Sequence, residues 1–427
     1  MTAPAARLNR RAVGAWCLYD WGNSAFPAIV STFVFPTYFT QAVATDAIAA
    51  TAAWGTALTL AGLVVAVLSP VLGAVADRAG GQKSWLLAFT LFNVAAIAAL
   101  WYVRPHADFV WLGLVGIALA TIAFELATVF YNALLPTVAP PSHLGRVSGW
   151  GWGVGYVGGI ACLVAVLLLF VQTETPAFGL SKEDAAHVRA TSPFAALWYL
   201  VFALPLFFIV AEPRALREPV TRAVRNGIAD LVRTLRTLKN RPMLAWFLGA
   251  HMVYMDGLNT LFAFGSIYAA GTFGMQLEEV LTFGIALNVC AGLGALAFAW
   301  VDDGWGPKPT IAVGLVAVIL FGSALLFATS KTEFWLFGLL LGTFFGPVQS
   351  ASRSLVARLA RPEHRTQTFG LFALSARITT FVGPAILGWV AAAAASQRAG
   401  MATVIAFLIV GLALLWWKVP ARVGAGT

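Results

Sequence analysis

Residues 109–137 read FVWLGLVGIALATIAFELATVFYNALLPT, and Glu125 is the one charged side chain among them. A helix needs about 20 predominantly apolar residues to cross the hydrocarbon core of a bilayer, and this run is long enough. Its hydrophobicity is continuous rather than alternating, which is typical of a spanning helix and excludes a β-barrel. This stretch therefore predicts a membrane-spanning helix.

Eleven further apolar runs of comparable length occur along the chain, so we expect an all-α membrane protein with twelve transmembrane helices. The predicted spans are 14–43, 50–76, 84–103, 109–137, 146–172, 193–211, 243–271, 277–301, 309–329, 333–358, 366–394 and 400–418.

The composition agrees with this fold class. The 427 residues are 60% hydrophobic and only 11% charged, whereas a soluble domain carries about 25% charged and 45–50% apolar residues. The net charge of +9 comes from short basic stretches between the apolar runs, so we expect no nucleic-acid partner. The cysteines have no disulfide or zinc spacing, and a Walker lysine motif is missing. We therefore expect no metal, no cofactor and no use of ATP.

The basic residues predict the orientation. Membrane proteins concentrate lysine and arginine in their cytoplasmic loops. With both termini inside, the cytoplasmic segments hold most of the basic residues, and the opposite side keeps only five: Arg104, Lys182, Arg189, Lys331 and Arg398. We expect an integral protein of the cytoplasmic (inner) membrane with both termini in the cytoplasm.

The longest cytoplasmic connection, residues 212–241, is strongly basic. It contains Arg214, Arg217, Arg222, Arg225, Arg233, Arg236, Lys239 and Arg241. Apolar residues recur in its second half at helical spacing, which predicts an amphipathic helix at the membrane interface. This helix rests on anionic headgroups, or the segment is a linker that its charge keeps inside.

The two halves on either side of this linker resemble each other. Tyr19-Asp20-Trp21-Gly22-Asn23-Ser24 in the first helix corresponds to Tyr254-Met255-Asp256-Gly257-Leu258-Asn259-Thr260 in the seventh. The loop containing Asp77, Arg78 and Lys83 corresponds to one containing Asp303, Gly306 and Lys308. Parallel repeats with six spans each predict two pseudo-symmetric six-helix bundles, 1–211 and 242–427, joined by the linker 212–241. Such bundles suit alternating access to a site between them.

These motifs carry a resemblance to a known family. The Gly-x-x-x-Asp-Arg-x-Gly pattern of residues 73–80 resembles the signature loop of the major facilitator superfamily, and the predicted fold is accordingly the major facilitator fold. Within that superfamily, four segments are similar to the autophagy-related vacuolar amino-acid effluxers and their bacterial relatives: 19–26, 131–136, 151–159 and 349–355. The resemblance implies a proton-linked or facilitative carrier, with amino-acid efflux as the activity of the fungal members. The chain departs from the superfamily at Gly81 and Gln82, where basic residues are usual.

The glycines of the fifth helix form two stripes at a spacing of four residues. Gly151, Gly155 and Gly159 form one stripe, and Gly149 and Gly153 form the other. Small residues on one face of a helix allow close contact with another helix in lipid.

Ionisable side chains near the middle of a bilayer cost roughly 2.5–3.5 kcal/mol on insertion scales, so they usually face a cavity or a partner. Asp20 and Asp256, with Asn23 and Asn259, occur in both repeats. A feature that is present twice serves the shared architecture, or else it contacts protons or substrate. The sequence leaves both interpretations open.

Glu125 and Arg377 have no charged counterpart in the other half, and charges that break the symmetry are the better candidates for chemistry. Our hypothesis is that Arg377 receives a substrate carboxylate while Glu125 binds an ammonium group or takes a proton. The alternative is a buried Glu125–Arg377 pair that locks the two bundles together.

Five further polar residues are predicted to act in gating. Asp77, Arg78, Lys83 and Asp303 lie at cytoplasmic helix ends, where ion pairs between bundles or helix-end contacts would hold an outward-open state. Arg353, at the inner end of the tenth helix, belongs with them. For Arg78 and Lys83 a solvated surface role is the alternative.

The sequence therefore predicts a transporter rather than an enzyme. We expect secondary active or facilitative transport of a small polar or zwitterionic solute, such as amino-acid efflux, with possible proton coupling and with membrane lipids around a monomer. The alternatives are an exporter of amphipathic or drug-like compounds, and a membrane receptor or scaffold that transports nothing.

Overall fold

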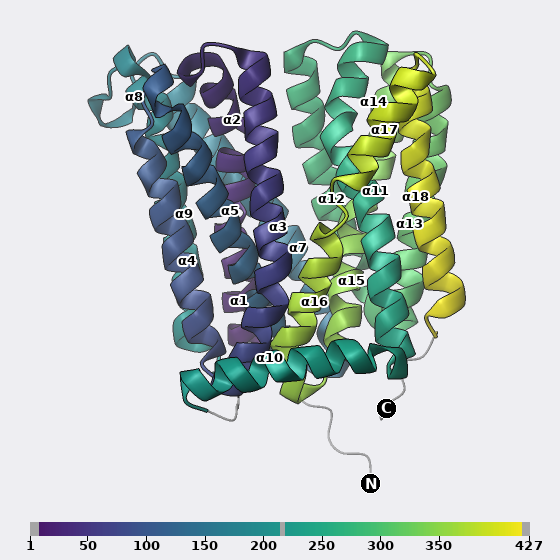
Figure 1. The fold of residues 1–427 in the computed structure, drawn as a ribbon. Helices are drawn as coiled ribbons and strands as arrows, with labels where there is room; N and C mark the ends of the chain where they lie inside the picture. The colour runs from purple at the N-terminus through teal and green to yellow at the C-terminus, as the bar shows by residue number, and fades with distance from the viewer. Residues whose placement is uncertain (1–7, 214–217, 421–427) are drawn as a thin grey trace.

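The computed structural model describes residues 8–213 and 218–420. Four arginines that contribute to the basic segments, Arg7, Arg214, Arg217 and Arg422, lie outside the described residues. Within the described residues the chain is helical, and the long helices run side by side along one axis (Figure 1).

Six spans precede the basic linker. The first span consists of a helix followed by wider, π-helical turns. The third to sixth spans each consist of one long helix with short helical segments next to it. Their elements are α1 (Arg10–Asn23) with η1 (Phe26–Phe33), α2 (Phe35–Tyr38) and η2 (Phe39–Val43); α3 (Ala47–Ala79); α4 (Gln82–Ala99) with η3 (Leu100–Tyr102); η4 (Ala107–Phe109) with α5 (Val110–Ala133) and α6 (Leu135–Val138); η5 (Pro141–His143) with α7 (Leu144–Val166) and η6 (Leu167–Val171); and α9 (Thr191–Ile209), preceded by η7 (Ala177–Gly179), η8 (Glu183–Ala185) and α8 (Ala186–Arg189).

Six spans follow the linker helix α10 (Val220–Thr237) and the turn η9 (Leu238–Asn240). Their elements are α11 (Pro242–Phe273); α12 (Leu277–Trp305); α13 (Pro307–Phe327); α14 (Lys331–Thr343) with α15 (Phe345–Leu359); η10 (Pro362–His364) with α16 (Arg365–Arg377) and α17 (Val382–Ala393); and α18 (Gln397–Lys418).

The twelve predicted spans are confirmed, and each predicted end lies within five residues of the observed one. By length and hydropathy alone, ten helices among the described residues qualify as membrane spans. The two spans that do not qualify are the first of each half. The first is interrupted at residues 24–25, and α11 carries His251, Asp256 and Asn259, whose polar groups lower its mean hydropathy. The low hydropathy of α11 indicates a position beside a polar site rather than a location outside the membrane.

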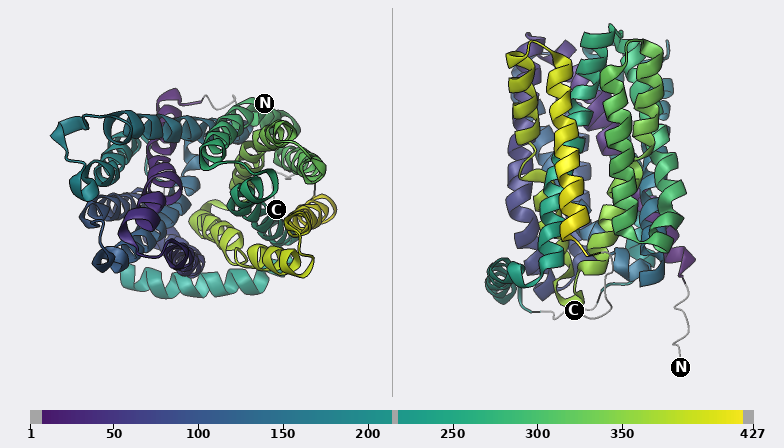
Figure 2. Two further views of the ribbon diagram at one scale, coloured as in Figure 1. Left: turned by 90° about the horizontal axis from the view of Figure 1, so that it is seen from above. Right: turned by 90° about the vertical axis from the view of Figure 1, so that its right-hand side faces the viewer.

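The helices form two bundles. Helices before α10 pack mainly on one another, as do the helices after it, and Figure 2 shows the two groups side by side when the molecule is viewed along its long axis. The main contacts between the bundles join α3 to α16 and α7 to α12. The helix α10 lies across the ends of the spanning helices, and we call this end of the molecule the α10 end (Figure 1). The start of α1 and the end of α18 lie there too.

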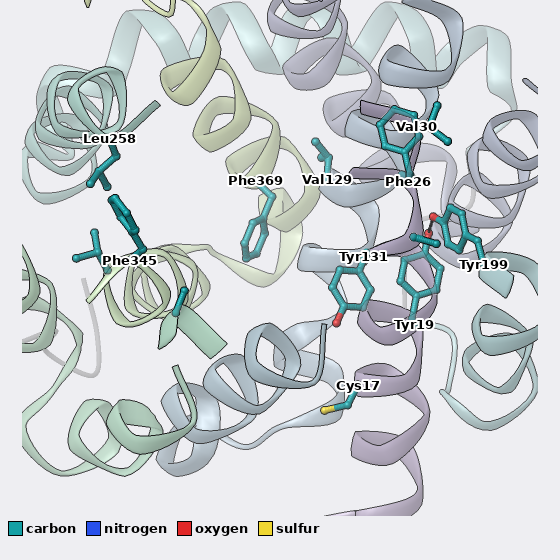
Figure 3. Packing of buried hydrophobic residues seen from close by; sticks show 14 of the residues in the cluster. Cys17, Tyr19, Phe26, Val30, Val129, Tyr131, Tyr199, Leu258, Phe345 and Phe369 are labelled. Atoms are coloured by element: carbon teal, nitrogen blue, oxygen red, sulfur yellow. Dashed lines mark hydrogen bonds between the residues drawn. The ribbon is translucent and has the colours of Figure 1, made fainter. Parts of the chain in front are cut away.

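Large apolar side chains cover the outside of both bundles. Trp111, Phe208 and Leu320 are all more than half exposed. Such a surface is costly in water but natural in contact with lipid. Inside, the largest fully buried side chains are aromatic, and Tyr19 and Tyr131 stack with their ring centroids 4.7 Å apart (Figure 3). The outer surface therefore fits a bilayer, and the interior is packed like that of other folded proteins.

Candidate functional site

A cavity of about 590 Å³ lies between the two bundles. Five of the six residues predicted to contact substrate or protons line it: Asp20, Asn23, Glu125, Asn259 and Arg377. Further polar groups at the wall, which were not among the predicted site residues, include those of Asn132, Asn288 and Gln349. The sixth predicted residue, Asp256, is buried behind the wall, with 1% of its surface exposed.

The two charges that break the symmetry lie together in this cavity. Arg377 is the last residue of α16 in the second bundle, and its Nη2 donates a hydrogen bond to Oε1 of Glu125 on α5 in the first bundle. The Arg377 side chain is 36% exposed and that of Glu125 is 16% exposed. The pair therefore connects the bundles and remains accessible from the cavity, which suits both the ligand hypothesis and the lock alternative.

A second pair between the bundles forms at another part of the wall. Arg353 extends from α15 into the first bundle, where Nη1 lies 3.3 Å from Oδ2 of Asp20 and donates to Oδ1 of Asn132 at 3.1 Å. Its Nε donates to Oγ of Ser148, and its Nη2 donates to the carbonyl oxygen of Ser148. Asp20 was predicted to be a substrate or proton residue and Arg353 a gating residue, but the two side chains contact each other and form one cluster.

Aromatic rings surround this cluster. The Arg353 guanidinium lies 4.7 Å from the ring centroid of Trp16, with Trp152 and Tyr131 also within 6 Å. A cation over an aromatic face gains about 0.5–2 kcal/mol, more when water is excluded. Arg353 is only 4% exposed, so the rings and the carboxylate of Asp20 together compensate for its burial. Trp16 and Ser148 were missed because, unlike Asn132, they do not occur in a recognisable motif.

The glycine stripes of α7 bring these elements together, as their spacing predicted. A Cβ on Gly151 would lie 2.5 Å from the Trp16 ring and 2.7 Å from Oδ2 of Asp20, so this stripe packs on α1. A Cβ on Gly149 would lie 2.6 Å from the Cβ of Ala299, so the other stripe packs on α12 of the opposite bundle. The helix α7 thus packs closely both on a helix of its own bundle and on a helix of the other bundle.

Asp256 has different surroundings from its counterpart Asp20. The eleventh span is interrupted at residues 378–381, and the second part, α17, begins at Val382. The backbone N–H of Gly383 donates to both carboxylate oxygens of Asp256, at 3.3 and 3.2 Å. The N-terminus of a helix favours a carboxylate because its free N–H groups and its dipole are positive. The repeated aspartates therefore share a position in sequence but have different partners.

Two predicted gating aspartates contact the opposite bundle at the α10 end. Asp77, near the end of α3, accepts hydrogen bonds from the backbone N–H groups of Thr366 and Gln367 at 3.0 and 2.9 Å. Asp303, near the end of α12, accepts from the N–H of Gly145 at 2.9 Å. Each aspartate thus binds the first turn of a helix in the other half, α16 or α7, and together they close the α10 end symmetrically.

The other two residues of the signature loop act elsewhere. Arg78 forms ion pairs with Glu218 at 2.8 Å and with Asp230 on α10 at 2.6 Å, so it connects α3 to the linker helix. Hydrogen bonds from Asn226 and Arg78 lower the pKa of Glu218 below its ordinary value. Because this carboxyl stays ionised at neutral pH, Arg78 keeps an anionic partner.

Lys83 contacts its own bundle. Its ammonium donates to the carbonyl oxygens of Phe207 and Val210 at the end of α9. Lys308, its counterpart in the repeat, donates in the same way to Trp416 and Val419 at the end of α18. A cation at the C-terminus of a helix satisfies free carbonyls and matches the helix dipole. The two lysines therefore fix the last helix of each half.

The chain is similar to a known protein family, to individual relatives and to solved structures. A family profile described as "Vacuole effluxer Atg22 like" matches residues 48–424. The uncharacterized MFS-type transporter YxiO of Bacillus subtilis is 27% identical over 407 residues, covering 94% of this chain and 93% of YxiO. Autophagy-related protein 22 of Coccidioides immitis is 21% identical over 404 residues, and the chain spans only 65% of that longer protein. Among solved structures, the fucose:proton symporter FucP of E. coli matches with a TM-score of 0.74 at 14% identity, covering 96% of this chain and 97% of FucP. This likeness shows a shared fold.

Proposed function

Given that the chain belongs to the family of Atg22-like vacuole effluxers, and is thus an integral membrane transporter of the major facilitator superfamily rather than an enzyme, we propose that it carries a small zwitterionic solute. Amino acids are the class that we propose, with export as the direction and alternating access of the two bundles as the mechanism. Family membership removes the support for a receptor that transports nothing.

The observation that carries this proposal is the Glu125–Arg377 pair at the wall of the cavity. A zwitterion has a carboxylate that suits a guanidinium and an ammonium group that suits a carboxylate. When such a ligand enters between Glu125 and Arg377, both charges keep a partner while the direct link between the bundles is replaced. Binding of the cargo is thereby connected to the movement of the bundles. The cavity volume of about 590 Å³ falls within the usual range of about 300–1,000 Å³ for small-molecule sites.

Proton coupling is a further part of the proposal. Glu125 faces the cavity, so, as the alternative to pairing with the substrate ammonium group, it can take up a proton when its arginine partner binds the substrate carboxylate. In this scheme the guanidinium of Arg377 always has an anionic partner, which is either the carboxylate of Glu125 or the carboxylate of the substrate. Asp20 and Asp256 have partners of their own in Arg353 and Gly383, which favours Glu125 as the residue that exchanges protons.

A thermal-shift screen of the purified protein against amino acids, peptides, nucleosides, sugars and drugs tests the substrate class. We expect stabilisation by amino acids and flux of the same compounds in proteoliposomes, with a rate that changes when a pH gradient is applied. Arg377→Gln should abolish the stabilisation, whereas Arg361→Gln, which removes an exposed arginine at the α10 end, should retain it. Unchanged affinity and maximal rate in Arg377→Gln would rule out the ligand role.

Export of amphipathic or drug-like compounds is the second candidate, because the cavity also has an aromatic wall. Phe262, Phe369 and Phe372 line it from the second bundle. If this function holds, apolar compounds will stabilise the protein in the same screen, and Arg377→Gln will leave their effect intact.

We also propose that the α10 end faces the cytoplasm of a bacterial inner membrane and that the protein is a monomer. The basic residues gathered at this end support the orientation. Labelling of single cysteines in intact cells tests it: Glu174→Cys in the loop at the opposite end should react with an impermeant maleimide, and Glu363→Cys at the α10 end should not.

A further inference from the structure

The linker helix α10 presents three faces of different character. Its buried face consists of Ala223, Gly227, Asp230 and Leu231. Its exposed residues divide into an apolar face and a basic face, which lie next to each other at 100° per residue. The apolar face consists of Val220, Val224, Ile228, Val232 and Leu235, and the basic face of Arg222, Arg225, Arg233 and Arg236.

The buried face fixes the rotation of α10 about its own axis. A Cβ on Gly227 would lie 2.9 Å from the backbone of Ala74, so α10 lies directly against α3. Leu231 packs in a small apolar cluster with Ala74, Leu244 and Leu371, which belong to α3, α11 and α16. The ion pair between Arg78 and Asp230 adds a polar contact. The apolar and basic faces are therefore held in defined directions, away from this contact.

The position of α10 places these faces at a membrane boundary. Figure 1 shows the helix lying across the spanning helices at one end, and the view along the long axis in Figure 2 shows it outside their ring. A helix in this position lies parallel to the bilayer at the level of the headgroups. If it were a solvated linker, five large apolar side chains would face water, which is unfavourable in proportion to their exposed apolar surface.

We propose that α10 is a docking surface for anionic phospholipids of the leaflet at the α10 end. The apolar face enters the boundary of the acyl chains, and the four arginines lie at the level of the phosphates. This is the arrangement of an in-plane amphipathic helix, and basic residues near an anionic leaflet are attracted to its negative surface potential. Because the same helix contacts α3, α11 and α16, the lipid surface is coupled to elements of both bundles.

Spin-label accessibility tests the direction of the two faces. Single labels at Val224→Cys and at Ala229→Cys, an exposed position between the arginines, are compared in nanodiscs with Cys17, Cys162 and Cys290 replaced by alanine. We expect the ratio of oxygen to nickel-chelate accessibility to be several-fold higher at Val224 than at Ala229. Equal ratios would overturn the proposal, because they indicate a linker in water.

The lipid dependence of stability tests the charges. The full-length protein should gain apparent melting temperature in nanodiscs that contain phosphatidylglycerol, relative to phosphatidylcholine alone. A variant with Arg222, Arg225, Arg233 and Arg236 replaced by glutamine should lose this gain, and the matched variant with four lysines should keep it. If the glutamine variant responds to phosphatidylglycerol as the wild type does, the arginines do not bind the anionic leaflet and the proposal fails.

Discussion

At the scale of single residues, the buried Arg353 and Asp20 form a charge pair that joins the bundles. Arg353 has its guanidinium among Trp16, Asn132 and Ser148, with Asp20 as its carboxylate partner. Removing one member of a buried pair is far more costly than removing both, because the remaining charge has no partner in a medium of low dielectric constant. This asymmetry gives a direct test of the pair.

We predict that Asp20→Asn lowers the stability of the purified protein by about 3–5 kcal/mol, seen as a large fall in the apparent melting temperature. The double variant Asp20→Asn/Arg353→Gln should be less destabilised than the sum of the two single changes. Additive effects in this double-mutant cycle would mean that the two side chains do not interact.

The sequence predicted which polar residues lie at the cavity better than it predicted which of them contact one another. Hydropathy gives the depth of a residue in the membrane but not the direction in which it points around the helix axis. Five of the six residues predicted to contact substrate or protons line the cavity, and Glu125 and Arg377, which the symmetry argument singled out, contact each other there. The pairing of Asp20 with Arg353 depends on how α1 and α15 are rotated and packed. This packing depends on tertiary contacts between residues that are 333 positions apart in the sequence.

At the scale of elements, the closed α10 end depends on two aspartates that cap helices of the opposite bundle. Loss of an N-terminal capping side chain costs about 0.5–2 kcal/mol, and in the proposed alternating-access mechanism this cost falls only on the conformation in which the α10 end is closed. Asp77→Ala or Asp303→Ala should therefore shift the population toward the state in which this end is open.

Double electron–electron resonance between labels at Ser142→Cys and Glu363→Cys, exposed positions in the two halves, measures this shift. We expect longer distances to gain population in both alanine variants. Asp46→Ala is the matched control because Asp46 caps α3, the helix in which it lies, through the N–H groups of Ile48 and Ala49. Distance distributions that stay unchanged in Asp77→Ala, or change equally in Asp46→Ala, would refute this gating role.

The glycine stripe of α7 allows a second test at this scale. Gly149→Ala places a methyl group 2.6 Å from the Cβ of Ala299 and 2.7 Å from the carbonyl oxygen of Ala295, so α7 and α12 must move apart. We predict lower thermal stability and a wider separation of the bundles. Gly249→Ala in α11, where the added Cβ meets nothing within 4 Å, should be neutral or should stabilise the helix by up to about 1 kcal/mol. Equal effects of the two changes would contradict the packing described for α7.

The fold itself could be predicted closely from the sequence, because long continuous apolar runs can adopt few structures other than a spanning helix in a bilayer. The interruptions within the spans could not. The break at residues 378–381 separates α16 from α17 and allows Gly383 to meet Asp256, yet the apolar run 366–394 continues through it. Backbone groups freed inside a membrane need polar partners, and those partners are far away in sequence.

At the scale of the whole molecule, the packing of α3 on α16 and three further sets of contacts join the two bundles. The aspartate caps and the α7–α12 contact close the α10 end, the Asp20–Arg353 pair lies at the cavity wall, and the Glu125–Arg377 pair links α5 to α16. In the proposed mechanism, a ligand that replaces the Glu125–Arg377 link weakens the connection between the bundles from within the cavity. The carboxylate of the cargo must then interact with Arg377.

The most direct test combines the protein and the ligand in one cycle. Binding of a transported amino acid and of the amine that lacks its carboxyl group is measured for the wild type and for Arg377→Gln. A hydrogen bond to a charged group contributes about 1.5–3 kcal/mol, so removing the carboxylate should weaken binding to the wild type by roughly ten- to a hundredfold. We predict that the same change in the ligand has little effect on binding to Arg377→Gln. An equal loss of affinity in both proteins would contradict the account, because it would show that the carboxylate is bound elsewhere.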